Sequence, residues 1–137
     1  MFNKILVANR GAVAARVIRA LSKLGIRSVA IYSDPDRELP YLAAADEVHR
    51  VGEADPRASY LNQDAILSIL RQSGADGLHP GYGFLSENFD FAKRVSAHGA
   101  CFIGPSPRWI EVMGHKTRAR DLMASHGMGM VPSSGLL

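Results

Sequence analysis

The residues best suited to chemistry are gathered in one decamer, His79–Asn88, which reads HPGYGFLSEN. Pro80 fixes one backbone angle, and Gly81 and Gly83 allow a tight turn whose main-chain amides can approach a ligand or another chain closely. Tyr82 between the glycines offers a flat aromatic face and a hydroxyl group. These residue types are equally typical of a packed structural loop and of a binding loop, so both interpretations stay open.

The end of the decamer carries residues that begin a helix. Ser86 or Asn88 can accept hydrogen bonds from the first free amides of a following helix, and the positive end of the helix dipole attracts an anion. Glu87 is favoured near that helix end by the same dipole without any ligand. The decamer therefore predicts a loop that runs into a helix N-terminus.

A second glycine-containing turn, Asn9–Ala14, follows the first apolar run of the chain. Dinucleotide-binding folds use three glycines at this position, and only Gly11 is present here. Asp34 lies where such folds place a ribose-binding acid, but an aspartate in the sequence SDPD is also ordinary turn chemistry. We therefore expect no nicotinamide or flavin cofactor.

The titratable residues form no recognisable metal set or nucleophilic triad. The histidines are scattered along the chain, at His49, His79, His98, His115 and His126, and none form a ligand pair on one helix face. Cys101 is the only cysteine, which excludes a disulfide within the chain and fits a reducing compartment. Its apolar neighbours predict a small buried core residue and not a reactive thiol.

Strands and helices alternate along the chain and must position these residues. Apolar or β-branched runs predict strands at Lys4–Ala8, Ser28–Tyr32, Glu47–Val51, Gly77–Leu78 and Cys101–Ile103. Helical periodicity and glycine stops predict helices at residues 12–24, 62–74, 88–97, 107–112 and 116–125, and one helical turn at 41–45.

This alternation with short connections is typical of right-handed βαβ units. The predicted fold class is α/β, with a doubly wound, Rossmann-like parallel sheet. Ligands of such sheets bind beyond the carboxyl ends of the strands. The loops to consider for a site are therefore residues 9–12, 33–40, 79–88 and 104–107.

Composition excludes several classes of function. The chain has 137 residues, 47% hydrophobic and 21% charged, which suffices for one globular core. Its net charge of +3 comes from interspersed charges, without the basic face of a nucleic-acid binder. No apolar stretch approaches the roughly 20 residues of a membrane span, and no signal peptide is evident. We expect neither nucleic acid nor membrane as a partner, and a cytoplasmic location, or the mitochondrial matrix in a eukaryote although no transit peptide is seen.

Three segments resemble one known family, biotin carboxylase. They are the decamer at 79–88, the segment KILVANRG at 4–11 and the segment FIGP at 102–105. The resemblance covers essentially the whole chain but only the N-terminal part of the family, so it implies the Rossmann-like domain that precedes an ATP-grasp module. On this basis residues 1–114 form the N-terminal domain, and residues 115–137 form a linker and the start of a truncated ATP-grasp module.

The resemblance implies one contact to ATP. The segment Met113–Lys116, which reads MGHK, is similar to the family's Met-Gly-Asp-Lys, whose lysine contacts ATP phosphate. Lys116 is therefore the ATP-binding candidate, since an ammonium group can reach a phosphate as a point charge. His115 replaces the family's aspartate, which changes the charge at the centre of the motif.

The resemblance also implies a biotin-site loop. Tyr82 matches the family's tyrosine near biotin, and its neighbours match the loop that shapes that site, namely His79, Gly81, Gly83, Glu87 and Asn88. None of them is assigned an acid or base role. The family's first turn usually carries a glutamate where this chain has Ala12, so one polar contact of a helix N-terminus is lost.

One face of the first predicted helix carries Arg16, Arg19 and Lys23. A solvated surface accounts for such a stripe, but members of the family often dimerise through this N-terminal region. Arg16 and Arg19 are therefore dimer-interface candidates, and Lys23 makes the helix more basic than is expected for the family.

The activity of the family sets the functional expectation. Biotin carboxylase uses ATP and bicarbonate to carboxylate the N1 nitrogen of biotin on a carrier protein, and its Mg²⁺ is held by carboxylates that lie beyond this chain. The implied partners are a biotin carboxyl carrier, a carboxyltransferase component and a second copy in a homodimer of the full-length protein. The final acceptor, an acyl-CoA, pyruvate or urea, stays open.

No catalytic residue falls within this chain, so the resemblance implies an enzyme fragment that is inactive by itself. The alternative is a non-catalytic assembly or dimerisation module that pairs with carboxylase subunits through the face of Arg16 and Arg19.

Overall fold

The computed structural model describes residues 1–129. In chain order the strands and helices of this part are β1 Lys4–Val7, α1 Gly11–Lys23, β2 Arg27–Ser33, β3 Glu47–Gly52, α2 Gln63–Ser73, β4 Gly77–His79, α3 Phe89–Ala97, β5 Cys101–Phe102, α4 Pro107–Gly114 and α5 Lys116–Ser125. Each strand and helix expected from the sequence is present, with ends that agree to within two residues. The helical turn expected at 41–45 is a short 3-10 turn at Leu42–Ala44.

The strands form one sheet in the order β3-β2-β1-β4-β5, and every neighbouring pair is parallel. The chain runs outward from β1 to β3, then returns to the other side of β1 and continues to β5. Parallel neighbours need crossover connections, and helices provide most of them. The order reverses between β1 and β4, which is the topological switch point of the sheet.

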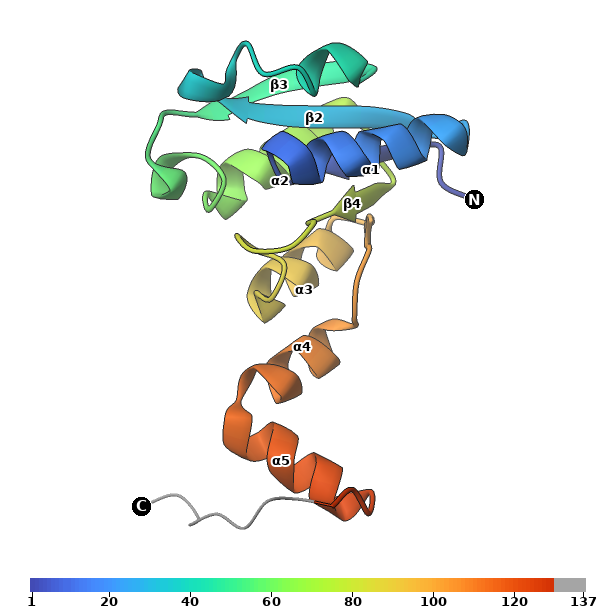
Figure 1. The fold of residues 1–137 in the computed structure, drawn as a ribbon, viewed down its shortest axis with the longest axis vertical. Coiled ribbons are helices and arrows are strands. Elements are labelled where there is room, and N and C mark those ends of the chain that lie inside the picture. The colour runs from blue at the N-terminus through green and yellow to red at the C-terminus, as the bar shows by residue number, and fades with distance from the viewer. Residues whose placement is uncertain (130–137) are drawn as a thin grey trace.

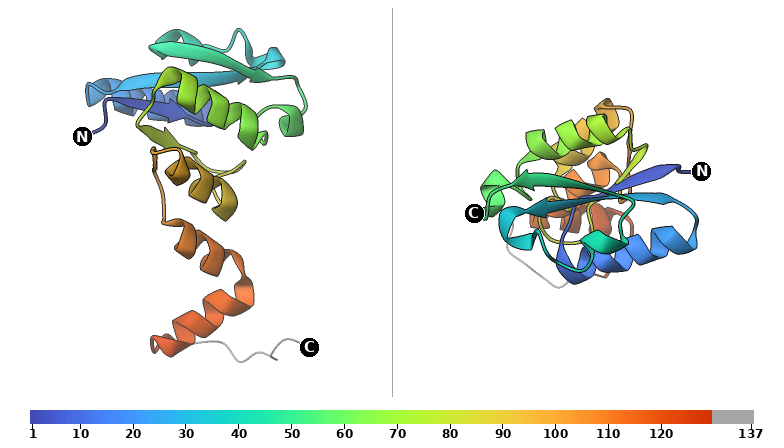
Figure 2. Two further views of the ribbon diagram at one scale, coloured as in Figure 1. Left: turned by 180° about the vertical axis from the view of Figure 1, so that it is seen from behind. Right: turned by 90° about the horizontal axis from the view of Figure 1, so that it is seen from above.

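Helices cover both faces of the sheet, so the predicted doubly wound α/β class is confirmed (Figure 2). On one face α1 packs against Ile5 and Val7. On the other face α2 and α3 pack against Leu6 and Leu78. Both faces of β1 are thus apolar, which is why it reads as a continuous apolar run and not as an alternating pattern.

Local signals define both ends of α2 and the start of α3. The side chain of Asn62 caps α2 by accepting a hydrogen bond from the Ala65 N–H, and Gly74 ends the helix in the left-handed conformation at φ +62°. Asn88 caps α3 in the same way, through the N–H of Phe91 at 2.8 Å. Of the two caps considered from the sequence, Asn88 is the one that forms.

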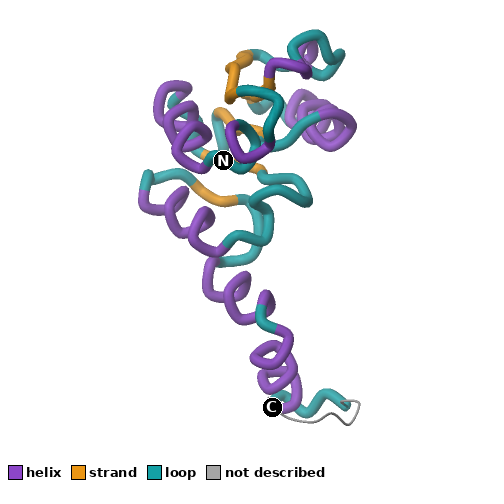
Figure 3. The backbone as a smooth tube through the Cα atoms, turned by 90° about the vertical axis from the view of Figure 1, so that its left-hand side faces the viewer, coloured by secondary structure: helices purple, strands orange, loops and turns teal. Residues whose placement is uncertain are grey.

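Helices α4 and α5 project away from the sheet as an arm (Figures 1 and 3). The arm is residues Pro107–Ser125, in which α4 packs against α3 and α5 packs against α4. Ile110 is its one buried residue, and α5 has none. No helix among residues 1–129 combines the length and the apolar content required to cross a bilayer.

The prediction that Cys101 is a buried core residue is wrong, because its side chain is exposed. Successive residues of a strand point to opposite faces of the sheet. Phe102 points into the core with α3, so Cys101 points to the opposite face. Strand β5 lies at the edge of the sheet, and Cys101 is not among the residues of the α1 cluster on that face.

Candidate functional site

The site lies at the switch point between β1 and β4, whose carboxyl ends open on the same edge of the sheet. Asn9 and Arg10 follow β1 at this edge. The decamer 79–88, called the decamer loop below, begins at the last residue of β4. Two segments that lie about 70 residues apart in the sequence therefore meet where parallel α/β sheets bind their ligands.

Asn9 holds the first half of the decamer loop through hydrogen bonds of its side chain. Its side chain is buried, and its Nδ2 group donates hydrogen bonds to the carbonyl oxygens of Pro80 at 2.8 Å and Tyr82 at 2.9 Å. Its Oδ1 accepts a hydrogen bond from the N–H of Arg10 at 2.9 Å. With both loop carbonyls turned inward, the side chain of Tyr82 is 75% exposed.

The backbone of Gly81 packs closely against the N-terminal end of α1. Its φ of +66° favours glycine, and an added Cβ would lie 2.6 Å from Val13 Cγ1 and 2.7 Å from Asn9 Nδ2. The close approach that the sequence predicted is therefore made here to the protein's own first helix. Gly83, at φ +72°, has no atom within 4 Å of such a Cβ and serves the turn, where its carbonyl accepts from the Ser86 N–H.

His79 presents a neutral imidazole to the site. Burial lowers the pKa of its side chain below the ordinary value. Its Nδ1 accepts a hydrogen bond from the Gly81 N–H at 3.0 Å, so the neutral ring carries its proton on Nε2. The free edge of the ring is therefore a hydrogen-bond donor.

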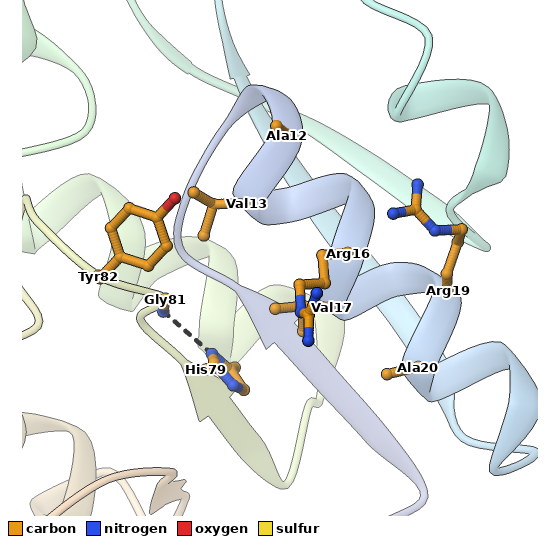
Figure 4. A pocket seen from close by; sticks show the side chains of 9 residues that line it. All are labelled: Ala12, Val13, Arg16, Val17, Arg19, Ala20, His79, Gly81 and Tyr82. Atoms are coloured by element: carbon orange, nitrogen blue, oxygen red, sulfur yellow. Dashed lines mark hydrogen bonds between the residues drawn. The ribbon is translucent and has the colours of Figure 1, made fainter.

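A cavity of about 580 Å³, called the loop cavity below, lies between part of α1 and the decamer loop (Figure 4). Its lining residues are Ala12, Val13, Arg16, Val17, Arg19, Ala20, His79, Gly81 and Tyr82. The structure thus brings the two predicted dimer-interface arginines to the same cavity as three residues of the predicted biotin-site loop. Among the described residues no acidic side chain lines this cavity, and the first turn of α1 contains none.

A second cavity, of about 600 Å³, lies between the other half of the decamer loop and the arm and is called the arm cavity below. Its lining residues are Ser86, Glu87, Pro105, Trp109, Ile110, Met113, Gly114 and Lys116. Glu87 of the predicted biotin-site loop and Lys116, the predicted ATP contact, therefore share one cavity. Gly83 and Asn88 line neither cavity and hold the turn and the helix cap.

The family model of the biotin carboxylase N-terminal domain matches residues 1–110. The chain belongs to the biotin carboxylase N-terminal domain family. Biotin carboxylase 2 of Bacillus subtilis (strain 168) is 47% identical over 132 residues, which cover 96% of this chain and 30% of that protein. The alpha subunit of mitochondrial methylcrotonoyl-CoA carboxylase from Oryza sativa subsp. japonica is 49% identical over 129 residues, which cover 94% of this chain and 18% of that protein.

Solved structures agree with this family. The biotin carboxylase domain dimer of the 2-oxoglutarate carboxylase from Hydrogenobacter thermophilus, in complex with MgADP, ADP and bicarbonate, gives a TM-score of 0.93 at 45% identity. The match covers 98% of this chain and 29% of that chain. The chain thus spans 30% or less of the length of these relatives.

A buried carboxylate supports the second half of the decamer loop. Asp36 is 3% exposed, and the guanidinium group of Arg10 donates to both of its carboxylate oxygens. The hydroxyl of Tyr60 donates to Asp36 Oδ2 at 2.5 Å and accepts from the Ser33 N–H at 2.9 Å. Hydrogen bonding from Arg10 lowers the pKa of Asp36, so the carboxylate stays ionised. We call Arg10, Ser33, Asp36 and Tyr60 the Asp36 network.

Sequence reasoning missed the roles of Asn9 and the Asp36 network. A polar residue directly after a buried strand, inside a segment that resembles the family, was a signal that could have identified Asn9. From the sequence alone Asp36 can be interpreted only as a turn residue, because its partner Arg10 lies 26 positions away. Among residues 1–129 no group of three or more histidine, cysteine or acidic side chains is arranged to hold a metal ion.

Proposed function

We propose that this chain is the N-terminal domain of a biotin carboxylase that carboxylates carrier-bound biotin with ATP and bicarbonate, and that it does not turn over alone. The observation that carries the proposal is the pair of cavities on the two sides of one loop. The first half of the decamer loop lines the loop cavity, and its second half lines the arm cavity with Lys116.

The loop cavity suits a flat, neutral, hydrogen-bonding group such as the bicyclic ring of biotin. Tyr82 offers an exposed aromatic face, His79 offers an N–H donor, and Val13 and Val17 supply an apolar wall. Gly81 keeps its backbone close to α1, so the cavity wall is fixed by packing. In this proposal these residues bind and orient biotin and exchange no proton with it.

The arm cavity suits one end of a nucleotide. Lys116 is the one cation among the described residues of its lining, and it would meet a phosphate oxygen of ATP. Glu87 is the one carboxylate among the described residues of its lining. Bound ATP supplies the phosphoryl group that activates bicarbonate, and the ligands of Mg²⁺ would come from residues outside 1–129.

The remaining parts of the proposal follow the family. The partners are a biotin carboxyl carrier, a carboxyltransferase component and a second copy that meets Arg16 and Arg19, in the cytoplasm or the mitochondrial matrix. The domain boundary is proposed between residues 114 and 115, where α4 ends and α5 follows after one residue. The segment 130–137, proposed as part of the linker into the ATP-grasp module, lies outside the described residues.

A domain replacement tests the proposed function. The corresponding N-terminal segment of the Bacillus subtilis relative is replaced by this chain, and bicarbonate-dependent ATP hydrolysis is measured in the presence of biotin. We expect a functional chimera in which Lys116→Gln lowers kcat/KM for ATP by about 10- to 100-fold. Lys93→Gln, which changes an exposed lysine of α3, is the matched control and should have no effect.

Two results would contradict the proposal. A folded chimera without bicarbonate-dependent ATP hydrolysis would show that this chain does not supply the domain's function. Turnover by the isolated chain would refute the claim that it is inactive alone. The intact mass of the polypeptide from its source cells, compared with 14.8 kDa, decides which form should be studied first.

An assembly module is the second candidate, and the surface of α1 favours it. Arg16, Arg19 and Lys23 are exposed there, and none forms an ion pair within residues 1–129. Co-purification of a carboxylase subunit that is lost on Arg19→Glu and kept on Arg57→Glu would support this role. A monomeric chain that is indifferent to both changes would exclude it.

A further inference from the structure

Two adjacent residues at the end of β1 reach the two halves of the decamer loop separately. Asn9 bonds directly to the backbone at Pro80 and Tyr82. Arg10 turns the other way and pairs with Asp36, whose partner Tyr60 stacks on the ring of Phe84. One anchor therefore holds the loop backbone from Pro80 to Tyr82, and the other holds Phe84.

The first anchor depends on the amide group of Asn9. Two carbonyl oxygens face one buried nitrogen, and only an NH₂ group can donate to both. The amide oxygen is used as well, because it accepts from the N–H of Arg10. A carboxylate of the same shape would place negative charge against the carbonyls of Pro80 and Tyr82, so no isosteric substitute preserves this anchor.

The second anchor holds a residue in an unfavourable backbone conformation. Phe84 has φ +40°, the one positive value for a residue other than glycine within residues 1–129. Its ring stacks on Tyr60, with centroids 5.1 Å apart and planes 26° apart. The guanidinium carbon of Arg10 lies 5.9 Å from the centroid of the same Tyr60 ring. Such strain persists only where the surroundings fix the residue, which here are the Asp36 network and its stacked ring.

The side chain of Tyr82 lies between the two anchors and is held by neither of them directly. Its side chain is 75% exposed, and its hydroxyl makes no hydrogen bond within residues 1–129. In Figure 4 its ring lies at the edge of the loop cavity, across from Val13. The direction of this ring is therefore set by the backbone on either side of it.

We propose that Asn9 and Phe84, the latter through the Asp36 network, are positioning residues that hold Tyr82 in one orientation at the loop cavity. Neither needs to touch a ligand. The value of that orientation for binding rests on the proposed function, but the positioning itself is a property of this chain and is measured without any ligand. The positioning can thus be refuted while the function stands, and the reverse also holds.

Backbone dynamics of the free chain provide the test. In the wild-type protein we expect an ¹⁵N order parameter at Tyr82 near the rigid value of about 0.85 and slow exchange of the Gly81 amide proton. Asn9→Asp should lower this order parameter below about 0.6 and speed the Gly81 exchange by about 10- to 100-fold. Amides of β2 and α2 should keep their wild-type exchange rates.

Asn62→Asp is the matched control. It makes the same chemical change at another asparagine whose Oδ1 accepts a backbone hydrogen bond, at the cap of α2, where a carboxylate is tolerated. We expect wild-type order at Tyr82 in this variant. An equal loss of order at Tyr82 in Asn62→Asp would mean that the added charge acts on the whole fold and not through the anchor.

Phe84→Asn separates positioning from stability. Asparagine tolerates the left-handed conformation, so the variant relieves strain while it removes the stacked ring. We expect the midpoint of urea unfolding to change little and the order parameter at Tyr82 to fall as in Asn9→Asp. Phe84→Tyr, which keeps a stacked ring, should have the wild-type order parameter at Tyr82.

The outcomes that overturn the proposal are equally specific. A low order parameter at Tyr82 in the wild-type chain would do so, because nothing would then be positioned. Wild-type order at Tyr82 in both Asn9→Asp and Phe84→Asn would do so as well. Where Asn9→Asp fails to fold, the Phe84→Asn and Phe84→Tyr pair decides the question alone.

Discussion

The decamer loop and the arm both carry residues proposed to meet a ligand, yet they are held by different means. The loop is fixed by buried hydrogen bonds from Asn9, by the contact of Gly81 with α1 and by the ring of Tyr60. The arm has one buried side chain, at Ile110, and Lys116 at the start of α5 is exposed. This chain therefore preorganises the loop by itself, whereas little of its own packing fixes the position of Lys116.

The exposed apolar residues of the arm fit the same contrast. Trp109 is 44% exposed and Met113 is 51% exposed, and both line the arm cavity. Exposed aromatic and methionine side chains beside a cavity are typical of surfaces that another segment covers. Since the chain spans 30% of the Bacillus subtilis relative, the proposed function predicts that the rest of a carboxylase supplies this cover.

The largest expected difference in unfolding free energy is between two glycines with similar φ angles, Gly81 of the decamer loop and Gly127 just beyond the arm. Gly81→Ala should lower the free energy of unfolding by about 3–4 kcal/mol, because the new Cβ meets Val13 and the fully bonded Asn9 in addition to the φ strain. Gly127→Ala, at φ +76° in open space after α5, should cost about 1 kcal/mol from strain alone. Urea unfolding of both variants measures the difference, and equal losses would contradict the account of Gly81.

Two lysines extend the comparison from the arm to the sheet, with a smaller expected difference in unfolding free energy. Lys4→Gln should cost about 1–2 kcal/mol, because Nζ of Lys4 pairs with Glu47 at 2.9 Å and donates to the Ser73 carbonyl at 2.6 Å in a partly buried setting. Lys116→Gln should change the unfolding free energy by less than about 0.5 kcal/mol, as expected for an exposed residue. A large stability loss in Lys116→Gln would show that the arm is integrated with the sheet more tightly than its burial indicates.

The smallest expected effect is a pH dependence that belongs to the loop alone. Burial lowers the pKa of His79 in the folded chain, so the unfolded chain binds this proton first as the pH falls. Stability should therefore decrease as the pH falls through the unfolded value of about 6.5, before the carboxylates titrate, and protonation of Nδ1 would also remove the acceptor of the Gly81 N–H.

Urea midpoints at about pH 7.5 and pH 5.5 measure this dependence. In His79→Asn, which keeps an acceptor for Gly81 and has no ionisable group, the difference between the two midpoints should shrink. An unchanged difference would assign the pH dependence to groups outside the decamer loop.

The sequence was informative wherever a local pattern carries the physics. The apolar run of β1, the asparagine cap and glycine stop of α2, and the alternation of strands and helices each depend on neighbouring residues, and each was predicted correctly. The decamer was recognised for the same reason, because its turn residues are contiguous. Burial at a sheet edge was not predicted, as Cys101 shows, because it depends on whether a distant helix covers that face.

What the sequence determined by itself was the α/β class, the family and the loop that bears Tyr82, since short-range patterns specify all three. What only the tertiary structure decided was how that loop is used. The tertiary structure divides the predicted site residues between two cavities. It also brings Asn9 to Pro80 and Tyr82, and Arg10 to Asp36. Those contacts span 26 to 73 positions, and no local propensity encodes them. They arise because parallel strands bring their carboxyl ends to one edge, where buried polar groups must find partners.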